Sequence, residues 1–376
     1  MNIKNQALGG FSLVELMVGM TIGLITVLVV TQVMSVAETR RQASISGADS
    51  VVNVGLGLYT IEREGKSAGY GLTALQTAIG CPIKAMHDTT PINLNLVPVT
   101  IIDGASGAPD QVRFLASSKS GVALPMRISQ DHRVETAHFF VDSDMGATDQ
   151  DLMLAVPTTS SGATWCTVFE HHSGGGGGNN GNNGNGGGQG LNQISHPSGQ
   201  SSLNPNAAWP SAGYTAGDAI VNLGSLSDRT YFIDNKKLRV SIYTLRTASS
   251  VSADLYPNIV QLQAAYGKDT NADAVVDTWD NATPATSAAW QQIRAIRVAL
   301  VARGQKRESG TVTLDGAAAA STCASTNPHP AAVCWKPNPA GDGVKIDVSA
   351  GNAEWQRYRY RVAETTIPLR NVIWRE

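Results

Sequence analysis

The sequence has little charge and lacks the short motifs of common enzymes. Only 15% of its 376 residues are charged, and the formal net charge is −2. A chain this close to neutrality has no bulk attraction for nucleic acid. It contains no G-x-S-x-G nucleophile turn, no P-loop and no H-E-x-x-H zinc motif. We therefore predict that the protein is not an enzyme.

Cysteine is also scarce, and it lacks the spacing of a metal or redox site. No two of the four cysteines form a C-x-x-C pair, which disfavours a zinc cluster and a thioredoxin-like site. An even number outside the cytoplasm suggests disulfides, and four cysteines leave three connectivities open. We favour Cys323–Cys334, which closes a small loop, and then Cys81–Cys166. Four unpaired thiols are the alternative, which an oxidising compartment makes less favourable.

Residues 11–37 lack proline and contain only one charged residue, Glu15. About 20 apolar residues in a helix cross the hydrocarbon core of a bilayer, and a span must be helical to satisfy its own backbone. The run is longer than the 7–15 apolar residues of a secretory signal, and its small residues, Gly9 and Gly10, precede it instead of following it. We therefore predict a membrane-spanning helix.

Glu15 is unusual because an ionised carboxylate in lipid costs roughly 2–3 kcal/mol and normally has a partner. No lysine or arginine lies within the run. If the chain were cut after Gly10, Phe11 would carry a new α-amine one helical turn before Glu15. That amine, from the same chain or from a neighbour, is the nearest available cation.

Residues 10–15, GFSLVE, resemble the class III signal of type IV prepilins and pseudopilins. The resemblance implies that a prepilin peptidase cleaves after Gly10 and N-methylates Phe11. It also implies that Glu15 pairs with the N-terminal amine of a neighbouring subunit during assembly. Lys4 in the short leader favours a cytoplasmic N-terminus, so the rest of the chain would face the periplasm or the exterior.

We predict that the helix continues beyond the apolar run to about Arg63. Apolar residues recur there at spacings of three and four: Ile45, Ala48, Val52, Leu56 and Tyr59. Three glycines weaken this helix by about 1 kcal/mol each relative to alanine: Gly47, Gly55 and Gly57. The expected organisation is a leader at 1–10, a hydrophobic and amphipathic helix at 11–64 and a β-rich soluble domain at 65–376. The fold class is α+β, type IV pilin-like.

Short strands are predicted through the soluble part, at residues 111–116, 137–141, 152–156, 164–169, 218–223, 230–233, 238–244, 258–266, 293–302 and 355–367. Asp234 and Asn235 supply a hairpin turn between two of them. Residues 173–190 are almost entirely glycine and asparagine, which predicts an exposed loop. A recognition surface is the alternative role for this loop.

Four segments resemble the PilW-like minor pilins: residues 61–71, 218–221, 266–269 and 368–371. The resemblance implies a low-abundance subunit of the inner membrane and then of the pilus filament, in a complex that primes assembly for twitching motility and adhesion. Its partners would be other minor and major pilins, the inner-membrane assembly machinery and the prepilin peptidase. A pseudopilin of a type II secretion system is one alternative, and a pilus-tip adhesin or DNA-binding subunit is another.

Residues 269–280, DTNADAVVDTWD, are the best candidate for a metal site, with calcium as the ligand. The oxygen donors fall at positions 1, 3, 5, 7, 9 and 12 of a calcium loop: Asp269, Asn271, Asp273, the Val275 carbonyl, Asp277 and Asp280. The match departs from the motif at Ala274, where the loop has glycine, and at Asp280, where it has glutamate. A solvated turn between strands is the alternative.

Two further groups of residues were weighed as binding sites. Arg357, Arg359 and Arg361 alternate with tyrosines, as in a nucleic-acid interface, but a half-buried strand with an exposed cationic face is favoured. His171 and His172 border the glycine-rich tract, and we expect them to be surface loop residues because no third metal ligand is placed beside them.

Overall fold

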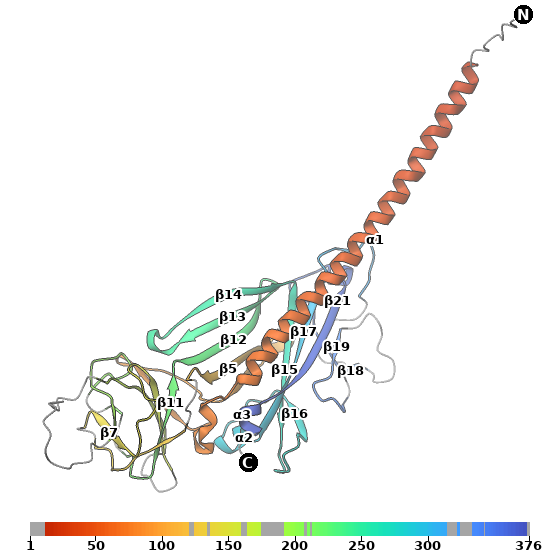
Figure 1. Ribbon diagram of the computed structural model, residues 1–376. Helices are drawn as coiled ribbons and strands as arrows, with labels where there is room; N and C mark the ends of the chain where they lie inside the picture. The colour runs from red at the N-terminus through yellow and green to blue at the C-terminus, as the bar shows by residue number, and fades with distance from the viewer. Residues whose placement is uncertain are drawn as a thin grey trace, which may run out of the picture.

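A computed structural model describes residues 12–119, 124–133, 136–158, 164–173, 192–206, 209–210, 213–313, 322–323, 333–341 and 343–373. A long N-terminal helix projects far beyond the β-rich part that follows it (Figure 1). The expected α+β class, a long apolar helix followed by a β-rich domain, is confirmed.

Helix α1 is continuous from Leu13 to Ser67, so it ends four residues beyond the predicted Arg63. At its end, Ala68 leaves the helical conformation, and its N–H donates to the Gly65 carbonyl at 3.3 Å. Gly69 then takes a φ of +80°. This left-handed conformation costs glycine little, so the chain turns away there.

An antiparallel sheet of four strands lies against the second half of α1, in the order β16-β15-β17-β21 (Figure 1). Its strands are β15 (Ile259–Lys268), β16 (Thr278–Asp280), β17 (Ile293–Arg303) and β21 (Tyr360–Pro368). Two short helices flank it, α2 (Ser287–Gln291) and α3 (Arg370–Ile373). β17 is apolar on both faces because α1 covers one face and a C-terminal flap covers the other.

A second antiparallel sheet, ordered β14-β13-β12-β5-β4, completes the core around α1. It contains β4 (Val99–Ile102), β5 (Gln111–Ser117), β12 (Leu226–Asp234), β13 (Lys237–Thr244) and β14 (Ser249–Pro257). A hairpin turn joins β12 to β13 as predicted, but its two residues are Asn235 and Lys236, at φ of 50° and 60°, because Asp234 still belongs to β12. Two consecutive positive φ values match the right-handed twist of a hairpin.

A separate lobe lies at the end of the β-rich part that is remote from the free end of α1 (Figure 1). Its sheet is ordered β1-β9-β8-β11-β6, beside a two-stranded sheet of β7 and β10. The strands are β1 (Ile83–Lys84), β6 (Met126–Arg127), β7 (His138–Val141), β8 (Leu152–Val156), β9 (Cys166–Glu170), β10 (Asn192–Ser195) and β11 (Ala219–Gly224). One apolar cluster lies within the lobe, and a second is shared with the neighbouring sheet through Leu115 of β5.

The remaining elements are short. They are β2 (Met86–His87), β3 (Thr90–Pro91), the flap strands β18 (Thr322–Cys323), β19 (Cys334–Trp335) and β20 (Gly343–Lys345), and the 3-10 turns Leu72–Ala74, Gln76–Ala78, Ala105–Gly107, Leu245–Thr247 and Trp355–Arg357. The last turn corrects the predicted strand at 355–367, which begins only at Tyr360.

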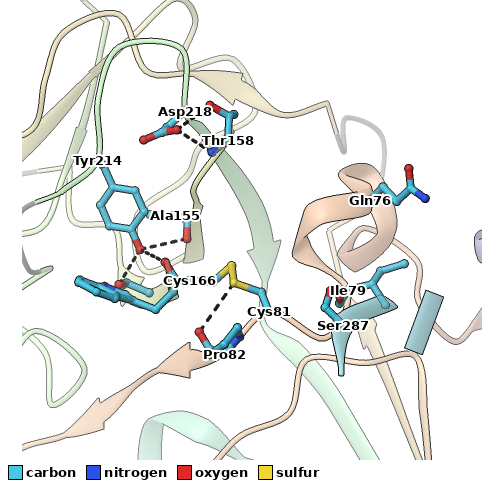
Figure 2. The surroundings of a disulfide bond; sticks show 12 residues. Gln76, Ile79, Cys81, Pro82, Ala155, Thr158, Cys166, Tyr214, Asp218 and Ser287 are labelled. Atoms are coloured by element: carbon cyan, nitrogen blue, oxygen red, sulfur yellow. Dashed lines mark hydrogen bonds between the residues drawn. A yellow bond between two sulfur atoms is a disulfide. The ribbon is translucent and has the colours of Figure 1, made fainter. Parts of the chain in front are cut away.

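Both favoured disulfide pairings are present in the structure. Cys323 and Cys334 join β18 to β19, with their Cα atoms 6.3 Å apart. Cys81 and Cys166, with Cα atoms 6.0 Å apart, attach the segment before β1 to β9 of the lobe (Figure 2). Two residues before Cys81, the Ile79 carbonyl accepts a hydrogen bond from the Ser287 hydroxyl of α2 at 2.6 Å. The lobe is therefore covalently tied to a segment that is fixed beside the four-stranded sheet.

Candidate functional site: the N-terminal helix

A capping box built from Ser12 and Glu15 starts helix α1. The Ser12 hydroxyl accepts from the Val14 N–H at 3.2 Å, and the Glu15 carboxylate accepts from the Ser12 N–H at 3.0 Å. These bonds satisfy amides that have no partner within the helix, and the positive end of the helix dipole favours the nearby carboxylate. Glu15 thus has one partner in its own chain, although no cation contacts it among the described residues.

Gly10 and Phe11 lie outside the described residues, since the description begins at Ser12. Cleavage after Gly10 and methylation of Phe11 therefore stay predictions.

The first part of α1 has an apolar surface that no other described segment covers. Of the described helices, only α1 is long and apolar enough to cross a membrane, and its most apolar segment is entirely exposed. Its large side chains are at least 47% exposed from Leu13 to Val36. The hydroxyls of Thr21, Thr26 and Thr31 donate to carbonyls three or four residues earlier in the helix. These bonds remove the need for water, so the surface suits a lipid or protein environment.

The second half of α1 packs one face into the β-rich part. Val54, Leu58 and Ile61 belong to the main apolar cluster, and Ile61 has no exposed surface. Two glycines on this face allow the sheets to approach closely. A Cβ atom at Gly57 would lie 2.9 Å from Leu300, and one at Gly65 would lie 2.9 Å from Ile367. The close approach explains why glycine occupies these helical positions.

Polar contacts also fix α1 against the two sheets. The Arg229 guanidinium of β12 donates to the Glu64 carboxylate at 2.5 Å. The hydroxyl groups of Thr60 and Tyr256 are 2.9 Å apart, which connects α1 to the edge strand β14. Near the end of the chain, the Asn371 side chain donates to the Ser67 and Ala68 carbonyls. The second half of the helix is therefore held along its length.

The apolar pattern predicted for the second half lies on the opposite face from the one that packs. Its members are exposed to solvent: Ile45, Ala48, Val52, Leu56 and Tyr59. The prediction of a helix was right, but these residues do not form its contact with the domain. Gly55, on the outward side, has nothing within 4 Å of an added Cβ. The chain thus leaves an apolar helix face uncovered from the apolar span down to Tyr59.

The predicted calcium loop forms an exposed turn in which the carboxylates accept bonds from the chain itself. Asp269 accepts from the Asp273 and Ala274 amides at 3.1 Å and is paired with Arg294. Asp277 accepts from the Thr270 amide and hydroxyl at 2.8 Å. The hydrogen bond from the Thr278 hydroxyl, and then those from Thr270, lower the pKa of Asp277.

The other predicted ligands of this loop do not converge either. Asp273 accepts from the Val275 amide and the Asn271 side chain, while Asp280 accepts from Lys268. Within the described residues, no group of three or more acidic, histidine or cysteine side chains could hold a metal ion. The arrangement favours the solvated-turn alternative, and calcium binding stays a prediction.

His171 is not a surface residue, which corrects the expectation from the sequence. It is 6% exposed, and burial lowers the pKa of its imidazole. His172 lies with Nε2 3.1 Å from the Glu170 carboxylate. A second group of buried histidines, His132 and His196, packs against aromatic rings of the lobe. Scattered positions in the sequence gave no signal for this group.

The three arginines near the C-terminus do not share one strand face. Arg357 lies in the 3-10 turn before β21, 3.9 Å from Glu354. Arg359 pairs with Glu308 at 2.9 Å, and Arg361 is an exposed residue of β21 beside α1. The predicted alternation therefore holds only from Tyr360 onward.

An open groove of about 820 Å³ follows the face of the second sheet that is remote from α1. Its floor contains Arg113, which donates to the buried Asp228 carboxylate through Nε and Nη2. Hydroxyl side chains of β12, β13 and β14 surround this pair, including Thr230 and Ser241. A pilus-tip adhesin could bind a ligand in this groove, but the described residues that line it do not favour one class of ligand.

A comparison with family models identifies the C-terminal part of the chain. Residues 227–371, from β12 to the first residues of α3, match the family "Type IV Pilus-assembly protein W". This part of the chain is therefore similar to a pilus-assembly family. The matched segment contains all strands of the two sheets beside α1 that follow β5 in the chain. It does not contain α1 itself. By its description, the matched family concerns the assembly of type IV pili.

Among solved structures, the chain is similar to a type IV-like pilin from Thermus thermophilus. The two sequences are 10% identical, with a TM-score of 0.34. The similarity covers 86% of this chain and 97% of the Thermus chain. No curated protein matches the sequence.

Proposed function

We propose that the protein is a minor pilin, anchored in the inner membrane by α1 and incorporated into a type IV pilus to prime its assembly. The observation that carries this proposal is the division of α1 into two parts. Its first part is wholly uncovered, whereas its second part is fixed to two sheets along one face only. The family match of residues 227–371 supports the pilus over a secretion pseudopilin.

The helix has two environments in succession. Before assembly, the uncovered span lies in the bilayer as a single-pass anchor, with the leader cytoplasmic and the domain periplasmic. A prepilin peptidase then removes residues 1–10 and methylates Phe11. In the filament, other subunits' helices cover the same apolar surface, together with the outward face that ends near Tyr59.

Glu15 selects the docked position of the subunit. Cleavage leaves Ser12 as the second residue, so its N–H still reaches the Glu15 carboxylate, as it does in the capping box. One amide hydrogen bond does not neutralise a carboxylate in an apolar core, so a cation from a neighbour remains favourable. The N-terminal amine of an adjacent pilin supplies that cation at the matching depth.

The test combines a genetic and a chemical measurement. Mass spectrometry of the mature chain should show the loss of residues 1–10 and a methyl group on Phe11. In a deletion strain, Glu15→Gln should fail to restore pili and twitching. Glu38→Gln is the matched control because Glu38 is exposed on the same helix beyond the apolar span, where it bonds only Gln42.

Two results would contradict the proposal. An intact leader on the assembled subunit would remove the maturation step. Normal twitching with a defect in exoprotein secretion would instead assign the chain to a type II secretion system.

A further inference from the structure

The part of the β-rich domain that lies nearest the apolar span is strongly basic. It comprises residues 38–49 of α1, residues 303–308 after β17 and residues 354–361 before and at the start of β21, named here the membrane-proximal patch. These ranges contain eight basic residues and four acidic ones, an excess of four positive charges. Since the whole chain has a net charge of −2, the remainder carries −6.

The loop in this patch is fixed to α1 at a defined distance from the span. The Gln305 and Lys306 amides donate to the Ser46 hydroxyl at 2.8 and 3.2 Å. Gly304 lies so close that an added Cβ would be 3.3 Å from the same oxygen. The loop and α1 therefore form one rigid unit, and the position of Ser46 along the helix sets the height of the loop.

That height brings the patch to the lipid headgroups. Ser46 lies nine residues after Ala37, the end of the apolar run, or about 14 Å along the helix axis. The headgroup layer extends about 5–8 Å beyond the hydrocarbon, and the Debye length at physiological salt is about 8 Å. Arg40 and Arg41, both exposed, fall within the headgroup layer. The loop after β17 falls within about one Debye length of it.

The cations in the patch are only partly neutralised by their own carboxylates. Arg307 pairs with Glu354 in a bidentate contact, and Arg359 with Glu308. Arg361 is exposed, lines the recess between α1 and the loop, and makes no ion pair with another described residue. Arg359 keeps 57% of its side-chain surface exposed despite its pair. Both arginines therefore retain donors for an external anion.

Aromatic side chains accompany these cations. The Arg303 guanidinium lies 4.3 Å from the centre of the Tyr358 ring. Trp355 begins the 3-10 turn that precedes Tyr358 and is partly buried against the apolar cluster of the flap. Tyrosine and tryptophan are enriched at the level of the headgroups, because their rings are apolar and their polar tips remain hydrated. Basic residues, in contrast, normally concentrate on the cytoplasmic side of a membrane protein. The excess of basic residues at the C-terminal end of the apolar span therefore indicates an anionic ligand.

We propose that the membrane-proximal patch binds the phosphates of anionic phospholipids in the periplasmic leaflet and so holds the domain in a fixed orientation before assembly. This inference rests on the proposed membrane anchoring. The phosphate oxygens accept hydrogen bonds from Arg40, Arg41, Arg359 and Arg361, while the loop after β17 faces the bilayer.

The test places the full chain in nanodiscs of phosphatidylcholine and phosphatidylglycerol at a 70:30 ratio. A photo-crosslinking residue replaces Gln305, which is exposed in the loop, and mass spectrometry counts the adducts of each lipid. We expect phosphatidylglycerol adducts to exceed their 30% share by at least threefold relative to phosphatidylcholine. Arg359→Glu with Arg361→Glu should return the adducts to the bulk ratio.

The matched control makes the same charge change far from the bilayer. Arg127→Glu with Arg133→Glu alters two exposed arginines of the remote lobe and should leave the enrichment unchanged. Adducts at the bulk ratio in the unmodified chain would overturn the inference. So would Arg359-dependent binding of a single-stranded dT20 oligonucleotide without lipid enrichment, which would assign the arginines to nucleic acid. A chain that does not co-elute with the discs would overturn the membrane anchoring as well.

Discussion

The buried histidines of the lobe should make its stability depend on pH, and His196 should dominate the effect. His196 is 2% exposed, and its ring lies about 5 Å from those of His132, Phe139 and Phe169. Neither ring nitrogen has a hydrogen-bond partner within the described residues. Burial, and then the nearby His132, lower the pKa of His196 to about 3. Burial also lowers the pKa of His132.

The sign follows from where the proton binds more tightly. The unfolded chain has a histidine pKa near 6.5, so below that pH it binds a proton while His196 in the folded chain stays neutral. The stabilisation from neutral His196 is complete above about pH 6.5 and is lost as the pH falls toward 3. At pH 5, about 1.5 units below the pKa of the unfolded histidine, the free energy of unfolding should be lower by about 2 kcal/mol.

Hydrogen exchange of the β9 and β11 amides, which belong to the sheet of the lobe, measures this free energy at pH 7.5 and pH 5 after correction for intrinsic rates. His196→Phe should reduce the difference between the two pH values by about 2 kcal/mol, because an apolar ring of similar size titrates nothing. His87→Phe is the control, since His87 lies outside this cluster. An unchanged pH dependence in His196→Phe, or a lobe that gains stability at pH 5, would refute the reasoning.

Three further predictions concern other parts of the fold. Gly65→Ala should lower the free energy of unfolding by about 1–3 kcal/mol in urea melts, because its Cβ would crowd Ile367, whereas Gly55→Ala should be neutral or stabilising by up to about 1 kcal/mol; equal effects would contradict the packing. Replacing Cys81 and Cys166 together by serine should cost about 4–5 kcal/mol, since the disulfide closes a loop of 85 residues, and a melting temperature unchanged from the parent would refute this. EDTA should leave the melting temperature unchanged because Asp269 is already paired with amides and Arg294, and a fall that calcium reverses would instead establish the metal site.

The sequence predicted the helix and much of the sheet where hydrophobicity is unambiguous. Residues 152–156 were placed as a strand with the observed bounds of β8, because a short apolar run buried on all sides has no competing interpretation. The strand β14 is absent from the prediction, since residues 249–257 include three serines, an alanine and an aspartate and lie on an exposed sheet edge. An edge strand pairs its backbone with one neighbouring strand only, so its side chains need not alternate between apolar and polar residues.

The candidate site was predicted less completely than the fold. The outward stripe from Ile45 to Tyr59 is more apolar than the face that packs, so periodicity alone selected the wrong contact face. The packed face includes Gly57 and Gly65, which have no side chain and therefore weaken the hydrophobic periodicity of that face. The helix thus has two faces with apolar residues, one packed against the sheets and one exposed, and the periodicity of the sequence follows the exposed one.

Because α1 is unbroken from Leu13 to Ser67, a pull on its free end reaches the domain without a hinge to absorb it. The contacts that receive this load, from Val54 to the Glu64–Arg229 pair, lie side by side along the helix axis and are strained in shear together. Bonds loaded in parallel must fail at once and not one by one. The junction should therefore withstand far more tension than any single contact in it.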